Sequence, residues 1–324
     1  MRSNVFQLVA RGVCLLSPMG ALMCTGCSRS DATIKKDPIL IRVATDGMDD
    51  NPLTLALKGP LQTYFRSGIQ IVRNDLPTNV RLIEEGRVEL AITPVNVAYM
   101  AFTEGWGGLP RPHSRLRGIA AIYAIPLHLV AAGGSGIRAW SDIRGKRIAT
   151  GPPNSTTQLT VKMTLESLGL SLADIDSQGI NGDAAVKALR EGKVDAVFHR
   201  GNDPPSTIPK LLRLPGASIV PLSMAETEMI HSRHPFLHGL VTPAGMYGNH
   251  PAVETIGLDS LVVCSASLPD ELVYAVTRAV FETLEGPTGS IGPFQPVDLR
   301  KVEATQIPLH PGAAAYFRER ELFQ

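Results

Sequence analysis

Short apolar runs alternate with helical patterns along the first third of the chain. The runs begin at Ile39, Ile69 and Leu90, and apolar residues recur at helical spacing after each of them. The expected helices cover residues 51–66, 78–86 and 95–103, with Gly86 as the stop of the second one. A strand–helix repeat of this kind predicts a mainly parallel sheet with helices on both faces.

The segment 116–132 departs from that repeat. Two apolar runs, 119–123 and 127–131, flank Pro126, and the flexible sequence 133–136 follows them. We interpret the two runs as strands that carry the chain across a boundary between two lobes.

A second α/β pattern follows this boundary. Strands are expected at 146–150, 194–198 and 219–222, and helices at 156–168, 183–192, 208–212 and 224–231. Apolar strands at 239–242 and 255–263 then lead back to the first lobe, where helices are expected at 269–284 and 313–320.

The predicted fold class is therefore α/β, with two lobes, a hinge and a ligand cleft between the lobes. We expect residues 38–130 and 250–324 to form the first lobe and residues 131–249 to form the second. Clefts between lobes are preferred binding places for small ligands.

The N-terminus has the pattern of a secretory leader. A basic start with Arg2 and Arg11 precedes an apolar stretch that is too short to span a bilayer as a mature helix. We expect residues 1–27 to be a signal peptide and residues 28–37 to be a tether. The leader ends in Cys24-Thr25-Gly26-Cys27-Ser28, which is similar to a bacterial lipoprotein processing site. Lipidation at Cys27 and simple secretion are both open.

Composition narrows the function classes. The chain has 324 residues, a formal net charge of +1 and 5% aromatic residues, and it lacks a cluster of basic residues. These features argue against a nucleic-acid partner. Only Cys264 lies outside the leader, so an internal disulfide is excluded, and its apolar neighbours favour a buried small residue.

The turn Gly151 to Thr157 is the strongest local sign of binding chemistry. It follows an expected strand and opens a helix, whose first backbone N–H groups and positive dipole end attract anions. Asn154, Ser155, Thr156 and Thr157 add side-chain donors there. The alternative interpretation is an ordinary N-cap, in which one hydroxyl caps its own helix.

Signs of catalysis are weak. The eight histidines are scattered, His231 and His234 lack a neighbouring acid or Cys for zinc, and the chain has no Gly-x-Ser-x-Gly sequence. The pairs Asp49-Asp50 and Glu84-Glu85 are interpreted as solvated side chains. We expect a binding protein rather than an enzyme, without a cofactor, a metal site or catalytic residues.

Several segments, none of them diagnostic alone, carry a family resemblance through their order and coverage. These segments are 79–86, 89–92, 96–99, 116–121, 142–153, 185–189, 192–198, 268–270, 279–282 and 310–317. From about Ile39 to its C-terminus, the chain resembles the TAXI-type solute-binding subunits of TRAP transporters.

The resemblance implies a type II periplasmic-binding-protein fold that closes over one small solute, such as a carboxylate or an amino acid like glutamate. It also implies a monomeric protein in the periplasm, which delivers the solute to a separate membrane permease. The implied ligand-binding residues are Thr45, Asp46, Gly47, Asn96, Tyr99, Gly151, Asn154, Ser155, Thr156, Thr157, Gly201 and Tyr247. For Tyr99 a core aromatic and for Asn96 a helix cap are the alternatives.

Two turns depart from the family pattern. The first turn carries Asp46, Asp49 and Asp50 instead of a glycine-rich sequence, which would repel an anion unless these side chains point outward or bind a cation. Arg73, ahead of the second altered turn, is a further candidate that could hold a ligand carboxylate or pair with one of these aspartates.

Two other functions are compatible with the same fold. A stand-alone receptor would present its ligand to a membrane sensor, and an enzyme on this scaffold would need a nucleophile or metal set. The secretory leader disfavours the enzyme, because it removes the chain from cytoplasmic substrates.

Overall fold

The computed structural model describes five segments of the chain, which are residues 41–45, 69–73, 76–201, 207–285 and 305–320. The leader, the tether, Cys27, the first turn with Asp46 and Gly47, and the helix expected at 51–66 lie outside the described residues.

The first three strands form the parallel arrangement that the sequence predicts. β1 (Ile41–Thr45) lies between β2 (Ile69–Arg73) and β3 (Leu90–Pro94), and it is parallel to both. Helix α2 (Leu76–Glu84) leads into β3, and α3 (Val95–Thr103) follows β3 directly. Because parallel strands end on the same edge of a sheet, β1, β2 and β3 bring their carboxyl ends together.

Two long strands connect this region to the rest of the sheet. β4 (Leu116–Ala131) pairs antiparallel with β10 (Val253–Ser265) from Leu116 to Leu127. The sequence predicted two strands separated by Pro126, whereas the structure has one continuous strand. Pro126 lies opposite Gly257 in the register. A proline fits the extended backbone and removes only its own N–H from the ladder, so the strand continues through it.

Beyond Leu127, the same strand becomes part of a second group of strands. β7 (Ala196–Arg200) pairs with the end of β4 and is parallel to β5 (Arg147–Ala149), which is itself parallel to β6 (Asp176–Gln178). The order in the sheet is β2-β1-β3-β10-β4-β7-β5-β6, while β8 (Ser218–Val220) pairs with β4 and β9 (Leu237–Thr242) pairs with β10. The helices of this region are α4 (Thr156–Ser167), α5 (Gly182–Arg190), α6 (Thr207–Leu212) and α7 (Met224–Arg233), with short 3₁₀ turns at Trp140–Ile143 and Leu172–Asp174.

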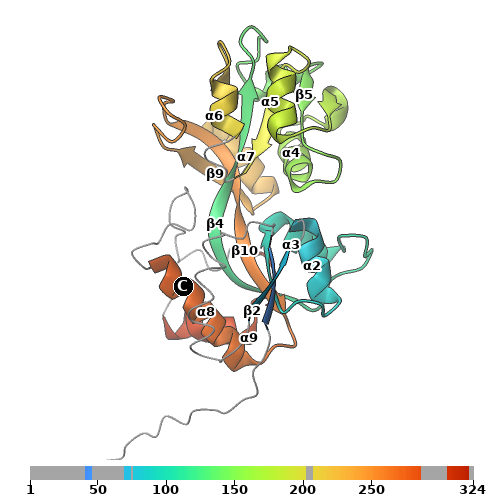
Figure 1. The fold of residues 1–324 in the computed structure, drawn as a ribbon, viewed down its shortest axis with the longest axis vertical. Helices are drawn as coiled ribbons and strands as arrows, with labels where there is room; N and C mark the ends of the chain where they lie inside the picture. The colour runs from blue at the N-terminus through green and yellow to red at the C-terminus, as the bar shows by residue number, and fades with distance from the viewer. Residues whose placement is uncertain (1–40, 46–68, 74–75, 202–206, 286–304, 321–324) are drawn as a thin grey trace, which may run out of the picture. The chain divides into compact units, whose positions relative to one another are not determined.

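The chain thus has the predicted α/β architecture with two lobes. Figure 1 shows β4 and β10 running from the first lobe, with α2, α3, α8 (Asp270–Glu285) and α9 (Pro311–Glu319), into the second lobe, with α4 to α7. The residue boundaries of the lobes stay a prediction.

Aromatic side chains of α8 and α9 pack together in the core of the first lobe. Phe281 lies with its ring centroid 5.2 Å from those of Tyr316 and Phe317. Cys264 belongs to the same core and is fully buried, and its burial raises the pKa of the thiol. The prediction of a buried small residue at Cys264 is confirmed.

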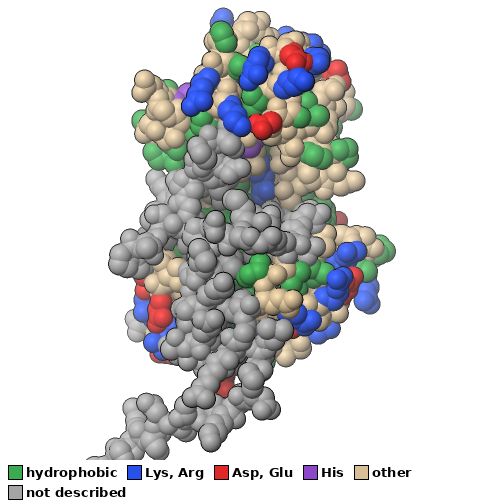
Figure 2. Space-filling view, in the orientation of Figure 1, with side chains coloured by type: hydrophobic (Ala, Val, Ile, Leu, Met, Phe, Trp, Pro, Cys, Tyr) green, Lys and Arg blue, Asp and Glu red, His purple; other side chains and the backbone are tan. Residues whose placement is uncertain are grey.

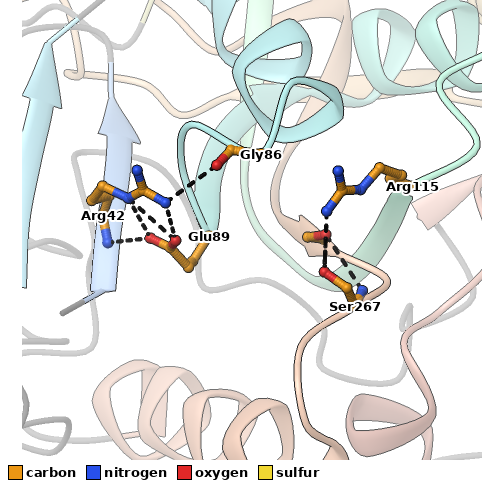
Figure 3. Close-up of polar contacts among 6 residues, drawn as sticks. Arg42, Gly86, Glu89, Arg115 and Ser267 are labelled. Atoms are coloured by element: carbon orange, nitrogen blue, oxygen red, sulfur yellow. Dashed lines mark hydrogen bonds and ion pairs between the residues drawn. The ribbon is translucent and has the colours of Figure 1, made fainter. Parts of the chain in front are cut away.

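An ion pair between Arg42 and Glu89 connects β1 to the residue just before β3 (Figure 3). It lies at the amino ends of these strands, on the edge opposite their carboxyl ends. The Arg42 guanidinium bonds the carboxylate of Glu89 and donates to the Gly86 carbonyl at 3.2 Å. Burial acts to raise the pKa of Glu89, but the hydrogen bonds from Arg42 outweigh burial and hold this pKa below its usual value. Nearby, Arg115 donates to the hydroxyl of Ser267 at 3.3 Å.

Gly312 generates a prediction about how closely α9 approaches α8. A Cβ at this position would contact the carbonyl oxygen of Asp270 and would lie 2.9 Å from the backbone nitrogen of Tyr274. Gly312→Ala should therefore lower the free energy of unfolding by about 2 kcal/mol, although alanine is the better helix former. Urea denaturation measures this difference. Exposed Arg318→Ala in the same helix is the control, and equal stability of the two variants would contradict the close approach.

Candidate functional site

The turn between β5 and α4 has a backbone shape that requires glycine. Gly151 has a φ of +86°, and its N–H donates to the Ile180 carbonyl at 3.1 Å. A Cβ on Gly151 would lie 3.0 Å from both Ser155 Oγ and Thr157 Cβ. The turn therefore wraps closely around the start of α4, and a side chain at Gly151 would push the first helical residues away.

Ser155 caps its own helix, as the N-cap interpretation predicted. Its Oγ accepts a hydrogen bond from the Gln158 N–H at 3.2 Å. Asn154, in the left-handed region with a φ of 62°, donates its N–H to Gln158 Oε1 at 3.1 Å. The N–H groups of Thr156 and Thr157 precede the first intrahelical hydrogen bond, so they remain available at the positive end of the helix dipole. The first turn of α4 contains no acidic residue.

Arg200 adds a full positive charge to this helix start. It ends β7, and its Nη1 donates to Thr156 Oγ1 at 3.0 Å. The apolar run in the sequence ends at Phe198, so it does not point to Arg200. The strand extends two residues further because His199 and Arg200 continue the pairing with β4. A basic residue directly after an apolar strand was the signal that could have found it. Gly201 follows at once.

The start of α3 faces α4 from the other lobe. Asn96 is fully buried, and its Nδ2 donates to Thr160 Oγ1 at 3.2 Å. Its Oδ1 accepts from the N–H of Val97 at 2.9 Å. Pro94 occupies the N-cap position, so the helix-cap interpretation of Asn96 is wrong. Asn96 is instead the second residue of α3, and its side chain contacts α4.

Tyr99 lies one turn further along α3. It is 37% exposed, and its ring centroid is 5.6 Å from that of Phe236, which follows α7 in the second lobe. Its position between lobes distinguishes Tyr99 from a residue of the core.

Thr45 and Arg73 lie side by side at the carboxyl edge of the first-lobe strands. They are partners in the register of β1 and β2, at the carboxyl ends of these strands. Their backbones thus lie on the edge from which α3 begins. Asp46, Gly47, Asp49 and Asp50 fall outside the described residues.

Tyr247 lies away from the start of α4. Its hydroxyl is 3.1 Å from His128 Nε2, and it packs in a cluster with Val130 and Val197. Helix α4 instead packs with Phe198, and neighbouring strand residues face opposite sides of a sheet. Burial raises the pKa of Tyr247 to about 12 and lowers that of His128 to about 3. The structure brings the other second-lobe candidates together and places Tyr247 on the far face.

The residues that the structure describes contain no group of three or more His, Cys, Asp or Glu side chains placed to hold a metal ion. Among their helices, none has the length and apolar character needed to cross a bilayer. The candidate site brings together the start of α4, the Thr156 hydroxyl, the Asn96 amide and the Arg200 guanidinium.

The model of the NMT1-like family matches residues 77–320, about three quarters of the chain. The chain belongs to the NMT1-like family. The matched region includes α3, the Gly151–Thr157 turn and Arg200, and it leaves out Thr45 and Arg73.

Solved structures share the fold at low sequence identity. A periplasmic sulfonate-binding protein (SsuA) of a putative sulfonate ABC transporter from Methylobacillus flagellatus KT has a TM-score of 0.56 and 13% identity, over 89% of this chain and 96% of its own. A Xanthomonas citri protein bound to ATP gives 0.54 and 11%, over 88% and 99%. The aliphatic sulphonate-binding SsuA from Escherichia coli gives 0.51 and 15%, over 87% and 84%. The chain therefore has the two-lobed fold of periplasmic binding proteins.

His128 generates a prediction about acid stability. Its folded pKa of about 3 lies below the ordinary value of 6.5, because burial disfavours the charged ring. Between these values the unfolded chain binds a proton that the folded chain does not, so stability falls as the pH falls from 6.5 toward 3. From pH 7 to pH 5 this single group should cost about 2 kcal/mol.

The variant His128→Gln should remove that part of the pH dependence. Urea denaturation at pH 7 and pH 5 measures it, with His231→Gln, on the exposed face of α7, as the matched control. If His128→Gln loses as much stability on acidification as the wild type and the control, His128 is not buried in its neutral form.

Proposed function

We propose that this chain is an extracytoplasmic solute-binding protein that captures a small organic anion between its lobes and delivers it to a membrane transporter. The observation that carries the proposal is the start of α4. There, helix amides, the Thr156 hydroxyl and the Arg200 guanidinium meet within reach of α3. We expect binding and no turnover.

The electrostatics at this point favour an anion. A helix start carries about half a positive charge, Arg200 adds a full one, and the first turns of α3 and α4 contain no acidic residue. A carboxylate can accept from amides and a guanidinium at once, and such charge-assisted hydrogen bonds are the strong ones. On the face seen in Figure 2, basic and acidic side chains of the described residues both occur on each lobe.

A carboxylate or an amino acid such as glutamate is the solute that the resemblance implies. The acidic residues Asp46, Asp49 and Asp50 favour a solute that also carries a positive group, which a zwitterionic amino acid provides. Two of the solved structures are sulfonate-binding proteins by name. A sulfonate presents acceptor oxygens of the same kind, so sulfonates belong in the test.

The partner would be the permease of a TRAP-type transporter, as the resemblance implies. The leader 1–27 would direct the chain out of the cytoplasm, and lipidation at Cys27 would anchor it to the membrane. One solved structure is named as part of a putative ABC transporter. Neighbouring genes discriminate between the two transporters: an ion-driven permease supports TRAP, and a permease with an ATPase supports ABC.

Mass spectrometry of small molecules released from the purified protein is the direct test of solute capture. A thermal-shift screen of amino acids, dicarboxylates and sulfonates should follow, because a solute that binds only the folded state raises the melting temperature with its concentration. A protein that releases no small molecule and shows no shift with any of these classes would refute the proposal.

Arg200 generates a specific prediction. Arg200→Gln should weaken the binding of any anionic solute found in the screen roughly tenfold to a hundredfold, since a hydrogen bond to a charged group is worth about 1.5–3 kcal/mol. Isothermal titration calorimetry measures the dissociation constant. Arg190→Gln, on the exposed side of α5, is the matched control and should leave affinity unchanged. Equal affinities of the two variants would place the anion elsewhere.

A further inference from the structure

A buried hydrogen bond connects the lobes directly. Asn96 Nδ2, from α3, donates to Thr160 Oγ1, in α4, at 3.2 Å, and both residues have an exposed fraction of 0%. Thr160 lies one turn beyond the proposed anion site, so this bond runs beside that site without forming part of it.

The side-chain polar atoms of Asn96 and Thr160 make hydrogen bonds within the protein. Thr160 Oγ1 donates to the Thr156 carbonyl at 2.8 Å while it accepts from Asn96. A hydroxyl has one donor and two acceptor positions, so both roles are compatible. Asn96 Oδ1 accepts from the Val97 N–H, which fixes the orientation of the amide. Asn96 is therefore held toward α4 by its own helix.

A second contact between the lobes lies one turn along α3. The Tyr99 ring packs against Phe236 with a centroid distance of 5.6 Å and an interplanar angle of 43°. Residues three apart lie on one side of a helix, so Asn96 and Tyr99 present one side of α3 to the second lobe. Phe236 is 6% exposed, and it also contacts His234 with a centroid distance of 5.5 Å.

We infer that these two contacts form an interlobe latch, in which Asn96–Thr160 and Tyr99–Phe236 hold the lobes together. This inference rests on the proposed function for its consequence, which is that the latch sets solute affinity. For a ligand that binds only closed lobes, the apparent association constant equals the intrinsic one multiplied by the fraction of protein that is closed. Asn96, Tyr99, Thr160 and Phe236 are thus positioning residues for binding.

Thr160→Val tests the latch with a side chain of the same shape. Loss of the hydroxyl leaves the Asn96 amide buried without its acceptor unless the lobes separate, so opening becomes more favourable. Amide hydrogen exchange of α3 and the start of α4, in the protein without solute, should become about fivefold faster, which corresponds to about 1 kcal/mol.

Thr164→Val is the matched control. Thr164 is a buried threonine of the same helix and makes the same bond to the carbonyl four residues earlier, at 2.8 Å, and this bond stays within α4. It should leave exchange of α3 unchanged. Equal acceleration in both variants would overturn the latch, because the effect would then come from the helix and not from the contact between lobes.

The aromatic contact allows a second test at a partly exposed position. Tyr99→Ala should accelerate the same amides as Thr160→Val, and Tyr99→Phe, which keeps the ring, should not. If Tyr99→Ala behaves as the wild type does, the ring contact plays no part in holding the lobes.

Solute binding separates the failure of the latch from that of the proposed function. Thr160→Val should weaken every solute of the screen by one common factor of at most about five, because the cost lies in the protein, whereas Arg200→Gln should act on anions alone. Factors that differ between solutes would overturn the latch as a positioning device. If no solute binds the wild type, the proposed function fails, and the exchange experiment still decides whether the latch exists.

Discussion

The pairing of β4 with β10 is the constraint on which the rest of the structure depends. These two strands belong to both lobes, so the sheet is continuous and the lobes can move only as these strands bend or twist. The register places Pro126 opposite Gly257, a residue without a ladder N–H against a residue without a side chain. Irregularities follow at Ser260/Leu261 and Val262/Val263. Local bends and twist are concentrated at such positions, which is where a hinge is expected.

The direction of the strands determines which helix starts and strand ends of the two lobes face each other. Because β1, β2 and β3 are parallel, their carboxyl ends lie on the edge where α3 begins. In the same way, the carboxyl ends of the parallel pair β5 and β7 lie on the edge that holds Arg200 and the turn into α4. Each lobe thus presents helix starts and strand ends toward the other. Free amides are an unavoidable property of a helix start, and burying them is costly unless an acceptor arrives. Under the proposed function, a solute anion meets that requirement at α4.

Much of this fold was predictable because its signals are local. The helix at 95–103 and the stop at Gly86 follow from apolar spacing and from a glycine that adopts a φ of +70°. The continuity of β4 was not predictable, because it depends on pairing with β10, which is distant in the sequence. The end of β7 was missed for the opposite reason: His199 and Arg200 are polar, so the apolar pattern stops before the pairing does.

The candidate site was predictable in part for the same physical reason. The sequence identifies the Gly151–Thr157 turn, because a strand, a glycine and a run of hydroxyl residues are consecutive. It cannot tell whether Ser155 caps the helix or binds a solute, since both use the same oxygen, and the structure assigns this oxygen to the cap. The partner of Asn96 was also inaccessible to sequence reasoning, because Thr160 is 64 positions away in another lobe.

The position of Thr156 explains how charge recognition and closure can be coupled. Its hydroxyl accepts from Arg200, and its carbonyl accepts from Thr160, which in turn accepts from Asn96. Arg200, Thr156, Thr160 and Asn96 form a short chain of hydrogen bonds from the strand end of one lobe to the helix of the other. An anion bound at the start of α4 would therefore lie beside the residue that supports the contact between lobes. The lobes respond to the solute only as far as the solute interacts more strongly with one of their arrangements.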